Sequence, residues 1–331
     1  MSISWGIIGA GKLADLWIAP AITRDEGSTL AAVCGRDAGR AQAFARRHGV
    51  PGAYDDYEAF LADESIDVVY IATPNGRHKD EAIAALNAGK HVLVEKPMAL
   101  SLDDGRRMRD AAAGAGRQLG VGFHLRHKHI NREARRLVSD GQLGRTFFLE
   151  ASVGAGKGLY PYDTWRSDPA LAGGGTVLNQ GTHTIDLVEF LTGQKVVEVA
   201  AIADHESEDV FVGSCVLDGG LLASLSSHQL HAGTRPDWVL FGEAAWLRAR
   251  GGTSPVPGDE LLLAEGGSAK TIATSGELSA YDDEVRAFAA AVALDQPFDA
   301  DGNDGLRAIA VAEAVYRSVR EGRRVPVPEI R

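Results

Sequence analysis

Residues 3–14 join a short apolar run to a glycine turn, and this pattern most restricts what the chain can fold into. Ile3 to Ile8 is typical of a buried β-strand, and Gly9-Ala-Gly11-Lys-Leu-Ala14 opens a helix-favouring run to about Thr23. This is the G-x-G-x-x-A arrangement, whose glycines permit a tight turn and close approach of a pyrophosphate to the backbone. The sequence therefore predicts a dinucleotide-binding βα unit with Gly9, Gly11, Lys12 and Leu13 as cofactor-binding residues.

Residues between Asp67 and Ser101 predict another unit of strand, helix and strand. Val68 to Ala72 and Val92 to Val94 are short β-rich runs, and Glu81 to Ala88 between them favours a helix. Ligands of open α/β sheets bind beyond the carboxyl ends of the strands, so the polar residues there are candidates for the site. They are Thr73, Asn75, Glu95 and Lys96. By position alone, Lys96 could equally serve chemistry or be a solvated loop charge.

The strand Thr29 to Cys34 ends in Gly35-Arg36-Asp37, which bears on the choice of cofactor. An acidic residue at the end of this strand would bind a ribose 2′-hydroxyl, whereas an arginine suits the 2′-phosphate of NADP. Arg36 therefore favours NADP over NAD. Two alternatives stay open, since Arg36 could stack on adenine and leave both cofactors possible, or Asp37 could reach the ribose.

The order of the elements predicts an α/β protein of two domains, which also fits a length of 331 residues. Alternating strands and helices to residue 123 predict a Rossmann domain with a doubly wound parallel sheet. From Arg145, β-rich segments follow one another with tight turns, as in antiparallel sheets. We expect residues 124–331 to form an α+β domain with an open, mostly antiparallel sheet. Its closing helices, Tyr281 to Leu294 and Asp304 to Arg320, could pack back on the first domain.

Composition excludes several classes of partner. A net charge of −11 argues against nucleic acid and against an anionic membrane surface, because both require a clustered basic face. No apolar run is long enough to span a bilayer, and no secretory signal is recognisable. Cys34 and Cys215 lie far apart in apolar runs, so we interpret them as buried free thiols in a cytoplasmic protein.

Three histidines, His124, His127 and His129, follow the last strand of the first domain. Their spacing suits neither one helix face nor a standard zinc motif, so we predict no metal site. Arg126 in the same turn is expected to face the cleft between the domains.

The densest polar cluster of the second domain runs from Trp165-Arg166 through a glycine triplet, Gly173 to Gly175, to a helix at about Asn179 to Leu191. Asn179 and His183 are four residues apart and share one helix face, so the amide could orient the imidazole. A lone helical histidine is more often structural, and spacing alone leaves both readings open.

Taken together, Gly9-Ala-Gly11, Thr73-Pro74-Asn75 with His78, Glu95-Lys96-Pro97 and the glycine triplet followed by His183 resemble the Gfo/Idh/MocA oxidoreductases over nearly the whole chain. The resemblance implies hydride transfer between NAD(P) and a sugar, cyclitol or related polyol, with Lys96 contacting substrate oxygen and His183 as the acid/base. It adds Pro74, His78, Trp165 and Arg166 to the cofactor-binding residues, alongside Arg126. It also implies a homodimer or homotetramer formed through the second domain's sheet.

One departure concerns Asn179, because many members of the family carry aspartate there. An amide can orient a hydroxyl or an imidazole but cannot stabilise an imidazolium by charge. The proton path is therefore less certain than the reaction class. Two other functions fit the same motifs: an NAD-dependent glycosidase that oxidises its sugar transiently, and a non-catalytic NAD(P)-binding sensor or scaffold. Net change in NAD(P)H with product would distinguish a dehydrogenase from the glycosidase.

Overall fold

The computed structural model describes residues 2–154, 164–205, 208–231 and 237–330. The chain divides into two compact units. Unit 1 comprises Met1–Gly122 with Tyr281–Leu306, and unit 2 comprises Phe123–Ala280 with Arg307–Arg331. The chain first passes from unit 1 to unit 2 after Gly122, one residue before the expected boundary. Residues 281–306, which we had counted with the second domain, belong to unit 1.

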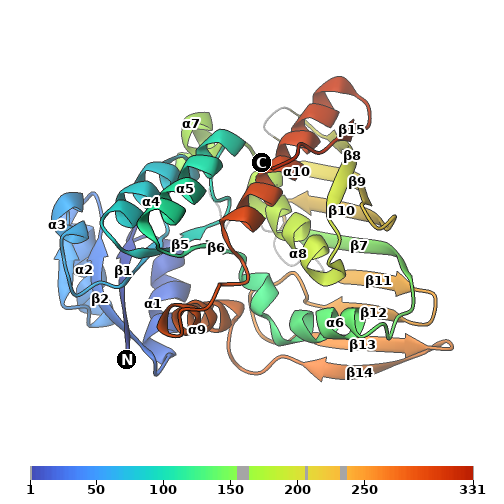
Figure 1. The fold of residues 1–331 in the computed structure, drawn as a ribbon, viewed down its shortest axis with the longest axis horizontal. Helices are drawn as coiled ribbons and strands as arrows, with labels where there is room; N and C mark the ends of the chain where they lie inside the picture. Colours follow the sequence, from blue (N-terminus) through green and yellow to red (C-terminus); the bar gives the residue numbers. More distant parts are fainter. Residues whose placement is uncertain (1, 155–163, 206–207, 232–236, 331) are drawn as a thin grey trace. The chain divides into compact units, whose positions relative to one another are not determined.

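Unit 1 is built on a six-stranded parallel sheet in the order β3-β2-β1-β4-β5-β6. This is the predicted doubly wound sheet. Figure 1 shows α4 and α5 over one side of the strands and α1 with α9 over the other. The strands are β1 (Ile3–Ile8), β2 (Ser28–Cys34), β3 (Gly52–Tyr54), β4 (Val68–Ile71), β5 (His91–Glu95) and β6 (Leu119–Gly122), and the α-helices are α1 (Ala19–Arg24), α2 (Ala38–His48), α3 (Tyr57–Leu61), α4 (His78–Asn87), α5 (Leu102–Ala115) and α9 (Ala280–Ala293).

The core of unit 1 explains why α9 belongs to it. Trp5 of β1 is fully buried, and its ring centroid lies 5.9 Å from that of Phe288 in α9. Gly120 in β6 gives α9 room, since a Cβ there would stand 2.6 Å from the Phe288 ring. Large aromatic side chains bury 150 Å² or more each, so these contacts fix the helix to the sheet.

Unit 2 contains a nine-stranded sheet in the order β14-β13-β12-β11-β7-β10-β9-β8-β15. The pairs on either side of β7 and β10 are antiparallel, as predicted, whereas β7 and β10 themselves run parallel, which was not predicted. We had not predicted the two strands β13 and β14. The strands are β7 (Thr146–Gly154), β8 (Val196–Ala203), β9 (Val210–Leu217), β10 (Leu222–His228), β11 (Trp238–Gly242), β12 (Trp246–Arg250), β13 (Glu260–Glu265), β14 (Ser268–Thr274) and β15 (Val325–Pro326).

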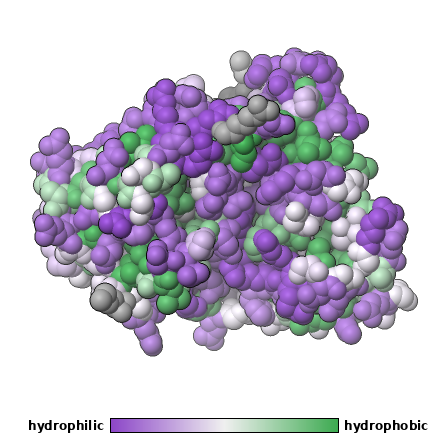
Figure 2. Space-filling view, viewed as in Figure 1, coloured by the Kyte–Doolittle hydropathy of each residue, from purple (hydrophilic) through white to green (hydrophobic). Residues whose placement is uncertain are grey.

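Helices α6, α8 and α10 lie over one face of this sheet (Figure 1). Helix α6 shows how: Ile130, Ala134 and Leu137 are buried while Arg132 and Arg136 are exposed, which is the 3.6-residue period of an amphipathic helix. In the view of Figure 2, hydrophilic side chains cover the surface over this helix. The α-helices are α6 (His129–Ser139), α7 (Pro169–Ala172), α8 (Thr182–Thr192) and α10 (Gly302–Glu321), which starts in unit 1.

Two of the helices that carry predicted site residues begin with a π-helical turn. One turn, Ala14–Ile18, follows the glycine fingerprint and leads into α1. The other, Val177–Gly181, contains Asn179 and leads into α8. Single π turns inside helices are rare and occur often at functional sites. The periodicity of the sequence did not reveal either of them.

Candidate active site

In unit 1 the glycine fingerprint has the geometry that a dinucleotide requires. Gly9 has φ of 104°, and a Cβ there would stand 2.7 Å from the carbonyl oxygen of Ala72, so only glycine fits. A Cβ at Gly11 would meet nothing within 4 Å, which leaves its backbone open to a ligand. Ala14 is fully buried at the start of the helix. Lys12 is exposed and Leu13 half-buried beside this opening.

His78 joins the two loops that follow β4 and β5. Its side chain is fully buried, Nδ1 lies 2.8 Å from the carbonyl oxygen of Pro97, and Nε2 lies 3.0 Å from that of Thr73. Burial lowers the pKa of His78, while the two backbone carbonyls that its ring nitrogens face oppose that shift. Any role of His78 in cofactor binding would therefore act through the positions of Thr73 and Lys96, which precedes Pro97.

A buried carboxylate supports each of these loops. Glu81 in α4 accepts from Thr73 Oγ1 and, at 2.8 Å, from Arg77 Nε. Glu95 at the end of β5 accepts from Tyr70 Oη at 2.6 Å, and burial raises the pKa of Glu95 while the Lys96 ammonium opposes that rise. Glu95 is thus held under the loop, with half-buried Lys96 next to it. Pro74 is half-buried and Asn75 buried in the same β4 loop.

The two residues considered for cofactor choice lie at the end of β2 with different surroundings. Arg36 is exposed. Asp37 begins α2, and its Oδ1 accepts a hydrogen bond of 2.7 Å from the backbone N–H of Arg40, which is the N-cap arrangement. One oxygen of Asp37 therefore has a structural task.

In unit 2, His183 is 7% exposed and lies against a second histidine. The ring centroids of His124 and His183 are 4.7 Å apart with an interplanar angle of 62°. We had considered His124 only as a metal ligand and set it aside. The two residues are far apart in sequence, and no spacing rule joins them.

Arg126, which was singled out in the sequence, forms a buried ion pair with Asp186 of α8. Arg126 Nε donates to both carboxylate oxygens of Asp186 at 3.0 and 2.9 Å, and Nη2 donates to Oδ1 at 2.5 Å. The guanidinium also lies over the rings of Phe123 and Phe190, each 5.5 Å from Cζ to the centroid. The ion pair between Arg126 and Asp186 therefore holds α8 against the turn before α6.

Trp165 and Arg166 lie together in a short 3₁₀ turn, with the guanidinium carbon 4.3 Å from the centroid of the indole ring. Both side chains are half-buried. The Arg166 guanidinium and the face of the Trp165 ring therefore form a cation–π pair.

The glycine triplet is held by a glutamate that the sequence analysis missed. Glu208, in the loop between β8 and β9, is 1% exposed, and its Oε1 accepts from the backbone N–H of Gly175 (3.1 Å), the N–H of Val177 (3.0 Å) and Tyr316 Oη (2.8 Å). Its own carbonyl accepts from Thr176 N–H at 2.9 Å. Glu208 thus caps the start of the helix that carries Asn179 and His183, from a different element. The acidic residues around it are typical of a solvated loop, so no local pattern marks Glu208.

Comparison with known proteins decides the family. Residues 3–123 match the oxidoreductase family with an NAD-binding Rossmann fold (GFO_IDH_MocA), residues 131–248 a GFO/IDH/MocA C-terminal domain, and residues 246–327 the C-terminal α/β domain of the same oxidoreductases. The chain belongs to the Gfo/Idh/MocA family. It is therefore an NAD(P)-dependent oxidoreductase acting on CH–OH groups, as the motifs predicted.

Relatives of this Gfo/Idh/MocA protein act on sugars by name. It is 30% identical over 327 residues to 1,5-anhydro-D-fructose reductase of Ensifer adhaerens, covering 96% of both chains, and 31% identical to D-xylose 1-dehydrogenase (NADP(+)) 2 of Haloferax volcanii, covering 96% of this chain and 98% of the other. The aldose-aldose oxidoreductase of Caulobacter crescentus, solved with glycerol, superposes with a TM-score of 0.91 at 27% identity, covering 98% and 100%. Among the described residues, none of the helices has the length and apolar character needed to span a bilayer.

Proposed function

We propose that this chain transfers a hydride between NADP(H) and a sugar, cyclitol or related polyol. The observation that carries the proposal is the pair of supported loops in unit 1, where His78 lies between Thr73 and the Lys96-Pro97 turn, and Thr73 lies against Gly9 of the glycine fingerprint. Gly9, Gly11, Thr73, Asn75 and Arg36 would hold the cofactor, whose nicotinamide supplies the hydride chemistry when bound.

Residues of the chain must then accept the proton of the substrate hydroxyl and stabilise the negative charge that develops on its oxygen. Oxidation of an alcohol releases a proton from the hydroxyl as the hydride leaves the carbon, and His183 would accept it as the general base. Lys96, as an ammonium, would stabilise the developing alkoxide. The named relatives are reductases and dehydrogenases, which favours net redox turnover over the transient redox of a glycosidase.

The preference for NADP rests on Arg36, which is exposed at the end of β2 while an oxygen of Asp37 caps α2. An exposed guanidinium can bind a 2′-phosphate with charge-assisted hydrogen bonds. The buried free thiols Cys34 and Cys215 agree with a reducing compartment such as the cytoplasm.

We also propose that a second copy of the chain covers the sheet face of unit 2 that bears Ile202, Val212 and Leu222. These side chains are 78%, 52% and 53% exposed, and Ile202 lies directly opposite Val212 across the β8–β9 pair. Ser214 and Ser224, a register pair, lie on the same face and are small enough for another sheet to approach closely. An exposed apolar sheet face of this kind favours self-association.

The chemical proposal is tested by Lys96→Met and His183→Ala with a panel of sugars and cyclitols. Each variant should lower kcat by about a hundredfold or more while cofactor affinity stays near wild type, because both residues act on the transition state. Near-normal turnover by His183→Ala would show that His183 is structural. If wild type changes no NAD(P)H with any polyol, the substrate class is wrong.

A further inference from the structure

Two arginines of unit 1 act on one buried carboxylate, that of Glu81 in α4. Oε1 of Glu81 accepts from Arg77 Nε at 2.8 Å, and Oε2 accepts from Thr73 Oγ1. Burial raises the pKa of Glu81, while the hydrogen bond from Thr73 and the charges of Arg77 and Arg36 oppose that rise. Two guanidiniums therefore lie within electrostatic range of a single carboxylate.

The parallel sheet brings these residues together around the glycine fingerprint. Gly9 N–H donates to the carbonyl oxygen of Cys34, the last residue of β2, at 2.8 Å. On the side of β4, a Cβ added to Gly9 would stand 3.2 Å from Cγ2 of Thr73. Arg36 follows β2 and Arg77 follows β4, so both lie beyond the carboxyl ends of strands that flank β1. Ligands of open α/β sheets bind at this edge.

The charge of Arg77 also reaches the end of β2. Burial raises the pKa of the Cys34 thiol to about 11, Glu81 and the two aspartates after β3 add to this rise, and Arg77 opposes it. One of those aspartates, Asp56, caps α3, because its Oδ1 accepts from two backbone N–H groups at the start of that helix. Arg77 therefore lies close to the strand end that Arg36 follows.

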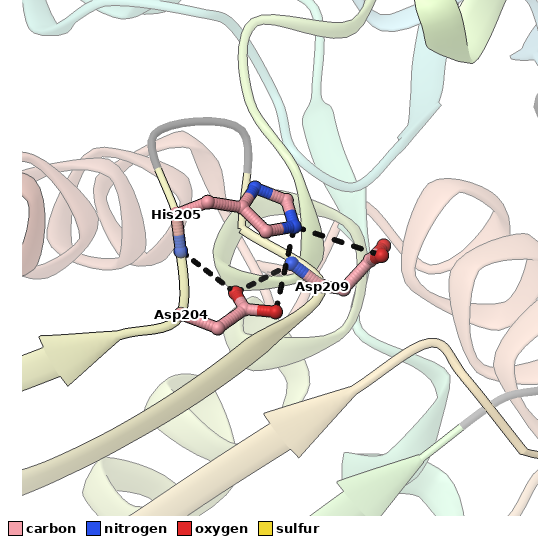
Figure 3. Close-up of side chains that lie close together, drawn as sticks. All are labelled: Asp204, His205 and Asp209. Atoms are coloured by element: carbon pink, nitrogen blue, oxygen red, sulfur yellow. Dashed lines mark hydrogen bonds and ion pairs between the residues drawn. The ribbon is translucent and has the colours of Figure 1, made fainter.

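The balance of charge at Glu81 differs from that of another cluster, in the loop between β8 and β9 (Figure 3). There the ring of His205 lies between two carboxylates, with Nε2 3.4 Å from Asp204 Oδ2 and 3.6 Å from Asp209 Oδ2. Asp204 Oδ1 accepts from three backbone N–H groups, which closes the loop. Carboxylates outnumber the imidazole in that cluster, whereas two guanidiniums face one carboxylate at Glu81. Of the two clusters, the one at Glu81 suits an anion.

We propose that Arg77 binds the 2′-phosphate of NADP together with Arg36, and that Glu81 holds Arg77 in position. The inference rests on the proposed function, which supplies the cofactor. The Arg77 side chain is 40% exposed, and Nε makes the only hydrogen bond between its guanidinium and the described residues. A guanidinium held through Nε presents its two terminal nitrogens as a fork, which matches two oxygens of a phosphate.

Fragments of the cofactor distinguish this role of Arg77 from two others. In a purely structural ion pair with Glu81, Arg77 would affect the binding of no nucleotide, and stacked on adenine it would affect all nucleotides equally. The fragments 2′,5′-ADP and 5′-AMP differ only in the 2′-phosphate. In calorimetric titrations we expect Arg77→Met to weaken the binding of 2′,5′-ADP about tenfold and that of 5′-AMP less than about twofold. NADP and NAD should follow the same pattern, because they differ by the same phosphate.

Further variants test the charge and the geometry of the site. Arg77→Lys keeps a cation beside Glu81 but loses the fork, and should weaken the binding of 2′,5′-ADP about threefold. Arg36→Ala with Arg77→Met should weaken it more than either change alone. Arg107→Met is the matched control, because Arg107 also forms an exposed ion pair with a carboxylate four residues away, that of Asp103 in α5. This control should leave the affinity for both fragments unchanged.

An unchanged affinity of Arg77→Met for 2′,5′-ADP would overturn the inference, and so would an equal loss of affinity for 5′-AMP. If Arg36→Ala weakens 2′,5′-ADP selectively and Arg77→Met does not, Arg77 lies outside the phosphate site while the proposed function stands. Equal binding of the two fragments to wild type would overturn both the preference for NADP and the inference. Neither fragment carries a nicotinamide, so a wild type that turns over no polyol would refute the proposed reaction without altering these binding results.

Discussion

Replacement of Glu208 offers the sharpest test of how the helix carrying Asn179 and His183 is held. Glu208→Ala removes the acceptor of three hydrogen bonds and leaves the N–H groups of Gly175 and Val177 without it. At about 1 kcal/mol per bond, plus the penalty for unsatisfied buried donors, the loss is about 3 to 5 kcal/mol. For a domain of this size, 3 kcal/mol corresponds to a fall in Tm of about 6 to 12 °C. Glu208→Gln keeps an acceptor oxygen and should lose far less.

The stability difference between Glu208→Gln and wild type should change with pH in a defined direction. Burial raises the pKa of Glu208 above its ordinary value of 4.5, and Oε2 is buried without a hydrogen-bond partner among the described residues. The folded state therefore favours the protonated form, and this stabilisation is complete below pH 4.5 and lost as pH rises through the folded pKa. The Tm of Glu208→Gln minus that of wild type should grow as pH is raised from 4 towards neutrality.

Differential scanning fluorimetry or calorimetry across this pH range measures both effects. Glu265→Ala, at an exposed glutamate that ends β13, serves as the control and should leave Tm unchanged. A Glu208→Ala variant within about 2 °C of wild type would refute the capping role. A Tm difference between Glu208→Gln and wild type that stays flat with pH would refute the effect of burial on this carboxyl.

Three further predictions concern the cofactor, the assembly and the buried ion pair. Arg36→Ala should weaken NADP binding about tenfold and leave NAD binding nearly unchanged, measured by titration of each cofactor; equal affinities in wild type would count against NADP. Val212→Asp should convert the oligomer to a monomer by light scattering, because it buries a charge against the second copy; a wild-type monomer at micromolar concentration would rule out the assembly. Arg126→Met should lower the free energy of unfolding, measured by chemical denaturation, by about 3 to 5 kcal/mol, and Arg126→Met with Asp186→Leu should recover most of this loss. Equal losses in the two variants would mean that lost packing, and not the unpaired charge of Asp186, causes the destabilisation.

The sequence predicted unit 1 well because its signals are local. The helix at Leu102–Ala115 is bounded by local signals, since Ser101 accepts from Asp104 N–H at one end and Gly116 has a left-handed conformation at the other. The strands β4 and β5 came from β-branched runs that are buried on both faces. In unit 2 the strands β13 and β14 were missed because their mixture of apolar, small and charged residues lacks clear alternation.

The site was only partly predictable, because its support comes from residues that are distant in sequence. Lys96 and His183 stand out by their motifs, whereas no sequence pattern near Glu208 indicates that it binds the backbone of Gly175. The position of Arg126 after a strand marked it as a candidate site residue, but its partner Asp186 lies sixty residues away and no local pattern joins the two. Hydrogen bonds between loops depend on tertiary structure and leave no periodic signal.

The π turn at Val177–Gly181 makes the length of this segment part of the site. A π turn contains one residue more than the α turn it replaces. Deleting one residue within it would allow a regular α-helix and would leave the later side chains facing as they do now, because the α turn covers the same rotation with one residue fewer. Glu208 holds the start of the segment and α8 keeps its phase, so Asn179, which lies within the π turn, would be the group that moves. Chains of this family are therefore best compared here by the number of residues between the glycine triplet and the histidine, a count that substitutions leave intact and a single deletion destroys.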